Sequence, residues 1–246
     1  MKCNPLFCSV VALLSATLFA EEVAKPVDRK AVDPKARHAA MIARQGGELT
    51  KPGSYAGFVA IVNRQARLSS NECERVAKFF AAKTRRNFKV VSDAKGAKVV
   101  LTVVDEPSSP KVLLAPEDGW GKVNVADLVA DLPSEEAKKK FFAIRARKLM
   151  IKAMSVLIGG GSSNYPGNIT NASTVRQLDT TPDDLPVDLL QRYDRYLDSI
   201  GVTAKIRATY RKAVREGWAP APTNDVQRKI WNDIRAIPTE PIRIKP

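Results

Sequence analysis

The middle of the chain carries short apolar runs at spacings typical of a sheet with a helix between its strands. The runs at 57–63, 88–91, 97–104, 111–115 and 122–126 have strand length, and the nearly all-apolar run at 97–104 favours a central strand. After the first run, Ser69-Ser-Asn-Glu72 has the pattern of a capping box and opens a helix expected to extend to about Arg86. This order predicts a sheet layer of α/β or α+β type, and we assign the α+β class with a small mixed sheet.

A long helix is predicted from Pro133-Ser-Glu-Glu136 to about residue 158, because the acidic residues meet the positive end of the helix dipole. Its first half is amphipathic, and the basic residues expected on the outside are Lys138, Lys139, Lys140, Arg145 and Arg147. Its second half is apolar on nearly all sides except at Lys152 and Ser155, which predicts a central helix buried against the sheet. The glycines at 159–161 end the helix; a phosphate-binding loop would place its glycines before one.

The rest of the chain divides by composition. Residues 162–182 are rich in Ser, Asn and Thr and predict a long surface loop, whereas 181–246 predict a helical C-terminal region. Helices are expected from 183 or 184 to 201, from 203 to 216, and after a cap at Thr223. The predicted organisation is a signal peptide at 1–20, a flexible linker at 21–52, an α+β core domain at 53–180 and the helical region at 181–246.

The first twenty residues have the layout of a secretory signal peptide. Lys2 provides a positive start, an apolar stretch without charge spans 6–19, and Ala20 stands at the expected cleavage point. An uncleaved anchor is the alternative, but a membrane span needs about 20 apolar residues. We therefore expect an exported protein, periplasmic or secreted, with no integral membrane segment after cleavage.

The chain is strongly basic, and this balance favours anionic partners. The formal net charge is +14 over 246 residues, and removal of Lys2 with the signal leaves 39 basic against 26 acidic residues. A solubilising role is the alternative, because the charges are spread along the chain. The candidate anion-binding residues are Lys205, Arg207, Arg211, Lys212, Arg215 and Trp218. Trp218 has a second interpretation, as the aromatic residue that fixes the last helix in place.

Common catalytic and metal sites find little support in this composition. His38 is the sole histidine, so neither an H-E-x-x-H zinc site nor a serine–histidine triad can be built. Cys73 lies on the first predicted helix and is interpreted as a core residue. The adjacent acids at 105–106 and 183–184 are common in loops and at helix starts. We predict no catalytic residue, metal or cofactor, although an enzyme that uses carboxylates alone stays open.

The central region nevertheless resembles a known family. The sheet with its strand Val123-Asn-Val125, the segment Arg145-Ala-Arg-Lys-Leu149 and the buried helix closed at Gly159 resemble the core of zincin metalloproteases, particularly the archaemetzincin-like group. In that group an edge strand lies above the active-site helix. The resemblance covers 55–180 and implies that 123–125 belong to that edge strand.

The same resemblance implies where the zinc site of the family would fall. Its two histidine positions fall at Lys152 and Val156, its glutamate at Ala153 and its third ligand near Ser162, and none of these residues is kept. It therefore implies a degenerate zincin fold without zinc or peptidase activity, and an unrelated α+β domain with a buried helix is the alternative. The segment 210–231 resembles a C-terminal module of uncharacterised exported bacterial proteins of the same kind.

Two functions follow from these observations. The first is an exported, non-catalytic binding or scaffold protein on a zincin-like core, with a ligand that the sequence does not name, such as a peptide. The alternative is a basic protein that binds an anionic polymer or membrane surface through its C-terminal helices.

Overall fold

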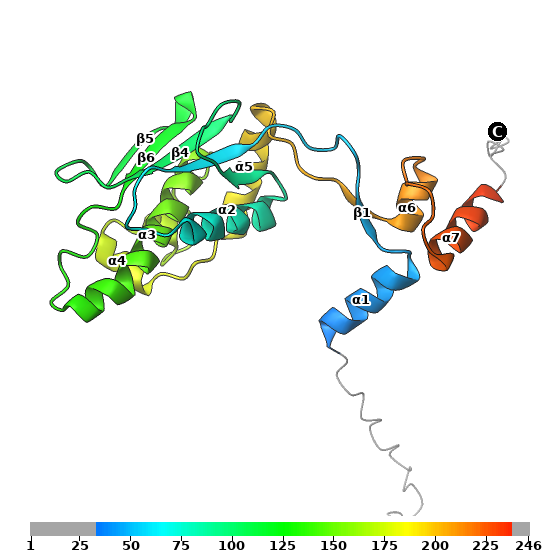
Figure 1. Ribbon diagram of the computed structural model, residues 1–246, viewed down its shortest axis with the longest axis horizontal. Helices are drawn as coiled ribbons and strands as arrows, with labels where there is room; N and C mark the ends of the chain where they lie inside the picture. The colour runs from blue at the N-terminus through cyan, green and yellow to red at the C-terminus, as the bar shows by residue number, and fades with distance from the viewer. Residues whose placement is uncertain (1–32, 238–246) are drawn as a thin grey trace, which may run out of the picture. The chain divides into compact units, whose positions relative to one another are not determined.

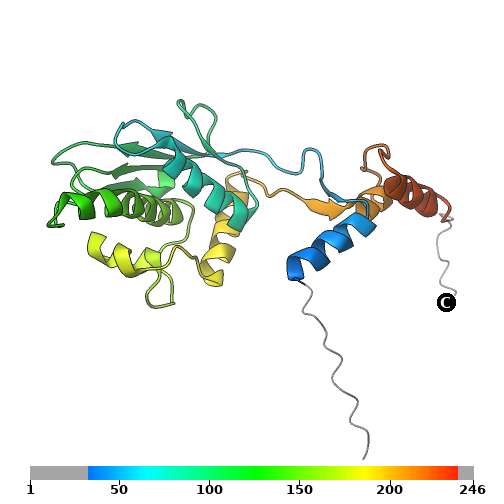
Figure 2. The same ribbon diagram turned by 60° about the horizontal axis from the view of Figure 1, so that its bottom comes forward.

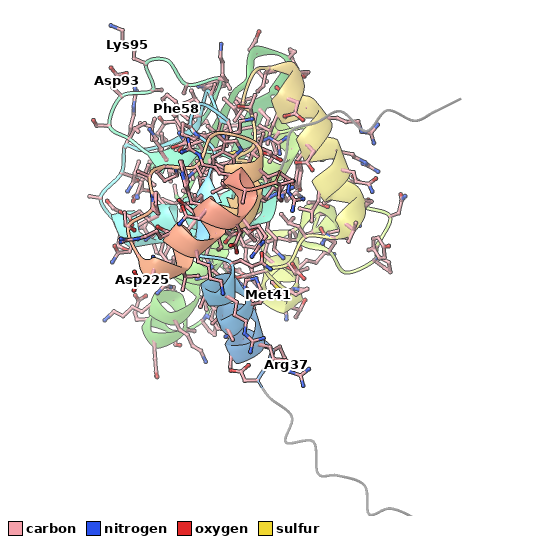
Figure 3. The ribbon with its side chains drawn as sticks, turned by 90° about the vertical axis from the view of Figure 1, so that its right-hand side faces the viewer. Arg37, Met41, Phe58, Asp93, Lys95 and Asp225 are labelled. Atoms are coloured by element: carbon pink, nitrogen blue, oxygen red, sulfur yellow. The ribbon has the colours of Figure 1, made fainter. Side chains whose placement is uncertain are left out.

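The computed structural model describes residues 33–237, so the predicted signal peptide at 1–20 lies outside the described residues. The chain forms two units, up to Arg44 and from Gln45 onward. In the first unit, the described residues form helix α1 (Pro34–Arg44), whose side chains, including those of Arg37 and Met41 (Figure 3), are not buried. Within residues 33–237, no helix is long and apolar enough to cross a membrane.

The second unit contains a five-stranded mixed sheet with the order β3-β2-β4-β6-β5 (Figure 1). Strands β2 (Val59–Asn63), β3 (Phe88–Val90), β4 (Val99–Val104) and β6 (Trp120–Asn124) are parallel, and β5 (Val112–Ala115) is antiparallel to β6. This confirms the α+β class and the central place of β4. The edge strands are β3 and β5, and β6 lies between β4 and β5, so the expectation that 123–125 belong to an edge strand is wrong.

Three helices cover one face of the sheet (Figure 2): α2 (Ser70–Thr84), α3 (Glu135–Leu157) and α5 (Val187–Ser199). The predicted N-cap of α3 is confirmed, since the Ser134 side chain accepts a hydrogen bond from the Ala137 amide. The predicted capping box of α2 is wrong. Ser69 occupies the cap position without a side-chain hydrogen bond, and the Glu72 carboxylate instead pairs with Arg75 and Arg147.

The segment predicted as a surface loop at 162–182 is partly buried. It contains a 3-10 turn at Ile169–Asn171 and helix α4 (Val175–Thr180), and its buried apolar residues belong to the core. These are Ile169, Ala172 and Leu178. The few apolar residues between the polar ones pack against α3, which the polar composition of the segment conceals.

The helix predicted at 203–216 is also wrong in its first half. Strand β7 (Arg207–Thr209) pairs antiparallel with β1 (Glu48–Thr50), and a shorter helix α6 (Tyr210–Arg215) follows. Strand β1 lies far away in sequence, 161 positions from β7 in the register pair Glu48–Thr209, and its hydrogen bonds satisfy the backbone groups of β7 that a helix would have satisfied internally. The last helix, α7 (Asp225–Arg235), is capped by Asn224 and not by the predicted Thr223.

Arg145 on α3, expected on the outside, is fully buried. Its guanidinium donates to the carboxylates of Asp131 and Asp179, with the Asp179 contact at 2.7 Å, and to the Leu128 carbonyl at 2.7 Å. These hydrogen bonds lower the pKa of Asp131 and raise the pKa of Arg145. The charge is tolerated because the turn before α3 and the helix α4 after it supply acceptors, and Arg145 thereby connects both of them to α3.

We predict that Arg145→Ala destabilises the protein by about 3 kcal/mol, because it leaves acceptors unpaired in a buried site. Urea denaturation measures this change in the free energy of unfolding. The matched control is Lys138→Ala on the same helix, which removes an exposed pair with Glu135 and should cost about 0.5 kcal/mol or less. Equal effects of the two substitutions would contradict the structural role of Arg145.

Candidate functional site

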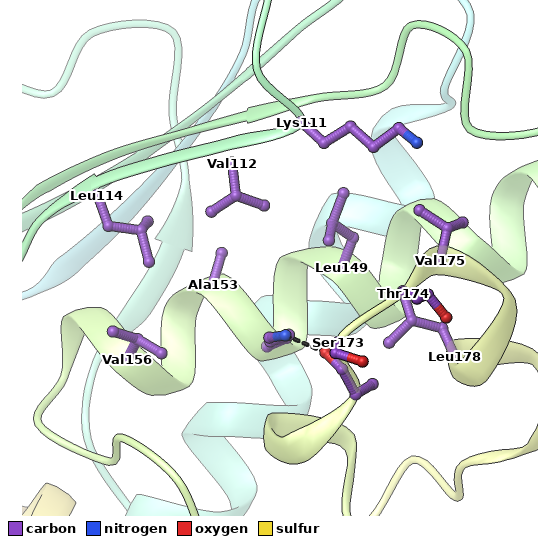
Figure 4. Close-up of a pocket in the computed structure, with 12 residues that line it drawn as sticks. Lys111, Val112, Leu114, Leu149, Ala153, Val156, Ser173, Thr174, Val175 and Leu178 are labelled. Atoms are coloured by element: carbon purple, nitrogen blue, oxygen red, sulfur yellow. Dashed lines mark hydrogen bonds between the residues drawn. The ribbon is translucent and has the colours of Figure 1, made fainter.

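A pocket of about 330 Å³ lies between the edge strand β5, helix α3 and the segment 172–178 (Figure 4). Most of its lining is aliphatic, and no carboxylate among the described residues contributes to it. The lining residues are Lys111, Val112, Leu114, Leu149, Lys152, Ala153, Val156, Ala172, Ser173, Thr174, Val175 and Leu178. This volume is at the lower end of the range of small-ligand pockets, which suits one side chain or a short aliphatic chain.

The alternation of β5 directs two of its side chains toward the helix. Val112 and Leu114 line the pocket, whereas Leu113 between them is 47% exposed. Opposite Leu114 on β6 stands Gly121, where an added Cβ would lie 2.7 Å from a Leu114 methyl group and 2.8 Å from a methyl group of Leu157. Because Gly121 has no side chain, Leu114 of β5 and Leu157 of α3 can approach each other closely beside the pocket.

The outer edge of β5 presents backbone groups beside the same pocket. The Asn124 amide donates to the Lys111 carbonyl at 2.9 Å, which makes this opposed pair a hydrogen-bonded one. In an antiparallel pair of strands, hydrogen-bonded and non-hydrogen-bonded residue pairs alternate. The residue of β5 that follows Lys111 therefore forms no backbone hydrogen bond with β6, and its N–H and C=O groups point away from β6. With Val112 opposite Val123 and Leu114 opposite Gly121, the outward backbone groups belong to Val112 and Leu114.

Lys152 is the charged group of α3 at this pocket. It is half-buried, and its ammonium donates to the carbonyl of Ala172. Burial lowers its pKa below the usual range of lysine, because the apolar surroundings disfavour the charged form. Lys148, one turn earlier, donates to the carbonyls of Leu178 and Thr181 at 2.7 and 2.5 Å. The two lysines hold the segment that forms the third wall.

Lys152, Ala153 and Val156, where the resemblance was expected to place the zincin histidines and glutamate, all line this pocket. Lys152 and Val156 are half-buried there, and Ala153 is fully buried at its base, while Ser162 is exposed and does not contribute. Within residues 33–237, no group of three or more His, Cys, Asp or Glu side chains could hold a metal ion. A lysine ammonium and two alkyl side chains are not zinc ligands at neutral pH.

Other groups considered for chemistry have structural partners. Cys73 is buried, and burial raises its pKa to about 11, so it remains a protonated core thiol. The adjacent acids form ion pairs: Asp105 with Arg67, Glu106 with Lys122, Asp183 with Arg147 and Asp184 with Lys83. His38 lies exposed on α1.

The candidate anion-binding residues do not share one helix face. Lys205 precedes β7 and lies over the ring of Tyr55, with its ammonium 4.8 Å from the ring centre, and Arg207 is on β7. Arg211, Lys212 and Arg215 are exposed on α6. The Trp218 ring nitrogen donates to the Glu216 carboxylate at 2.7 Å, which lowers the pKa of that carboxyl.

Comparisons with known proteins give two structural neighbours. No family model matches the chain, and no curated protein matches it. An archaemetzincin from Methanopyrus kandleri shares 14% identity, with 61% of this chain and 99% of that chain covered and a TM-score of 0.48. A zinc-dependent peptidase from Methanocorpusculum labreanum shares 12% identity, with 56% and 100% covered and a TM-score of 0.40.

The sequence did not indicate the complete pocket. The resemblance identified the α3 positions, and the strand at 111–115 was predicted, but its place at the sheet edge was not. The third wall was missed because residues 162–182 were interpreted as a surface loop. The spacing of Val175 and Leu178, three positions apart, is the signal of a short amphipathic helix that could have indicated it.

Proposed function

We propose that this protein is an exported, non-catalytic peptide-binding protein. An extended peptide adds to the outer edge of β5, and one of its aliphatic side chains enters the pocket above α3. The observation that carries the proposal is the juxtaposition of outward backbone groups at Val112 and Leu114 with an aliphatic pocket formed by the side chains of the same strand.

Strand addition uses both features at once. The backbone of an added strand hydrogen-bonds to alternate residues of the edge, which provides affinity without regard to sequence. Every second side chain of that strand then points to the same face as Val112 and Leu114, toward α3. The pocket selects such a side chain by its size and its aliphatic walls. This geometry explains how one short edge strand could bind peptides with some specificity.

The absence of catalysis rests on the chemistry of the pocket residues. Hydrolysis of a peptide bond needs an activated water or nucleophile and a general base. The described lining residues include no imidazole or carboxylate, and the Lys152 nitrogen donates to the Ala172 carbonyl and is not hydrogen-bonded to a hydroxyl group of the lining. We therefore expect bound peptide to leave unchanged.

Export rests on the sequence pattern of residues 1–20, with its positive start, apolar stretch and small residue at Ala20. N-terminal sequencing of the mature protein is expected to begin at Glu21. A mature protein that retains Met1 would contradict cleavage.

The binding prediction uses the β-prone probe acetyl-Thr-Val-Thr-Val-Thr-amide and the full ¹⁵N-labelled chain. Titration should shift the amide resonances of Val112 and Leu114, because their N–H groups face the added strand. Val156→Phe places a larger side chain in the pocket from a half-buried position and should lower the affinity for the probe by roughly tenfold, about 1.4 kcal/mol. The matched control is Leu113→Ser, on the opposite face of the same strand, which should leave affinity unchanged.

Two results would contradict this function. An affinity that is unaltered in Val156→Phe would show that the probe does not use the pocket. Stoichiometric zinc, together with peptide hydrolysis that a chelator abolishes, would show that the protein is an enzyme.

A probe with N-methylated backbone amides should lose binding, since it cannot donate hydrogen bonds to the strand edge.

A second candidate function is the binding of an anionic polymer or membrane surface by the basic residues at 205–215. It is favoured by Arg207, Arg211 and Arg215, which are exposed and form no ion pair with any other residue in the range 33–237. Arginine side chains that are free of carboxylates can each contact phosphate or sulfate groups.

If this second function is correct, a heparin column retains the protein at low salt, and Arg211→Ala with Arg215→Ala moves elution to lower salt. Arg75→Ala with Lys78→Ala removes the same charge from exposed positions on α2 and serves as the control. Passage of the unaltered protein through the column without retention, or equal shifts for both double variants, would rule out a site on α6.

A further inference from the structure

The cations of α3 differ in how their charges are compensated. Arg145 pairs with Asp131 and Asp179, and Arg147 with Glu72 and Asp183. Lys148 has Asp183 at 3.7 Å. Lys152, the next cation along the helix, donates to the carbonyl of Ala172, and among residues 33–237 no carboxylate forms an ion pair with it.

This uncompensated charge is at the pocket, not in open solvent. Lys152 is half-buried beside aliphatic groups, where a charge without a counter-ion is costly. Its lowered pKa has burial as its cause, in agreement with the missing counter-ion. An ammonium group has three donors, and the Ala172 carbonyl accepts from one of them, so Lys152 retains donors for a ligand.

The other charged residue in the pocket lining is also positive. Lys111, which is exposed and directly precedes β5, also lines the pocket, and no Asp or Glu is among the lining residues that the structure describes. A ligand that fits these walls therefore combines an aliphatic group with a negative charge, and the charge lies near Lys152.

We propose that Lys152 binds the C-terminal carboxylate of a peptide whose last side chain is aliphatic. The inference rests on the proposed strand addition to β5 and names the end of the peptide that is recognised. At a chain terminus the carboxylate and the side chain branch from one Cα, so both reach a single small pocket. An internal Asp or Glu would bring the charge without the aliphatic group that the walls accommodate.

The test compares acetyl-Thr-Val-Thr-Val as the free acid with the same peptide as the amide, by titration of the full chain at pH 7. The free acid should bind about tenfold more tightly, since a hydrogen bond to a charged group is about twice as strong as a neutral one. Lys152→Met, which keeps the length and removes the charge, should abolish the difference between the two probes. Lys152→Arg should preserve it, and Lys111→Met, the control at the pocket rim, should preserve most of it.

The outcomes separate this inference from the function on which it rests. Equal affinities of acid and amide for the unaltered protein would overturn carboxylate recognition and leave strand addition standing. Failure of both probes to bind would instead reject strand addition itself. If octanoate competes as well as the free-acid peptide, the site accepts aliphatic carboxylates without a peptide backbone, and the assignment to a peptide terminus is wrong. Retention of the acid preference in Lys152→Met would also overturn the role of Lys152.

Discussion

The structure of the second unit depends on the burial of α3, a helix that carries cations into the core. Ten of its 23 residues are buried, and Arg145 and Lys148 are among them. Burying such charges is unfavourable unless acceptors surround them. The turn at 128–131 and the segment 178–183 provide carboxylates and carbonyls, and both are thereby fixed to the helix. The pocket exists because this segment is fixed opposite the edge strand.

Much of this fold could be predicted from local pattern. The strands β2 to β6, the course of α2 and α3 and the stop at Gly159 follow from apolar spacing and turn residues, which are local properties of the chain. The pairing of β1 with β7 could not be predicted, since each strand has three residues and their partners lie far apart in sequence. The outside position expected for Arg145 failed for a related reason. Helical periodicity places a charged residue on the outside, but it cannot show that Asp131 and Asp179 form ion pairs with Arg145 in the folded chain.

The candidate site could likewise be predicted only in part from the sequence. The family resemblance located Lys152, Ala153 and Val156, and these three positions line one pocket. Strand order was not accessible, because alternation gives the faces of a strand and not its neighbours. The predicted edge strand at 123–125 therefore differs from the observed one at the pocket, β5. The wall at 172–178 depends on hydrogen bonds between Lys148 or Lys152 and backbone carbonyls, and carbonyls leave no trace in the side-chain pattern.

The chemistry of the pocket also indicates what kind of function the helix supports. A group that activates water must accept a proton or bind a metal, and an ammonium at neutral pH does neither. What an ammonium in aliphatic surroundings does well is bind an anion, because few competing water molecules surround it. Lys152 brings such a group to a pocket whose other described lining residues are mostly aliphatic, which is the basis of the peptide-binding function that we propose. We therefore propose binding from both the shape and the charge of this pocket.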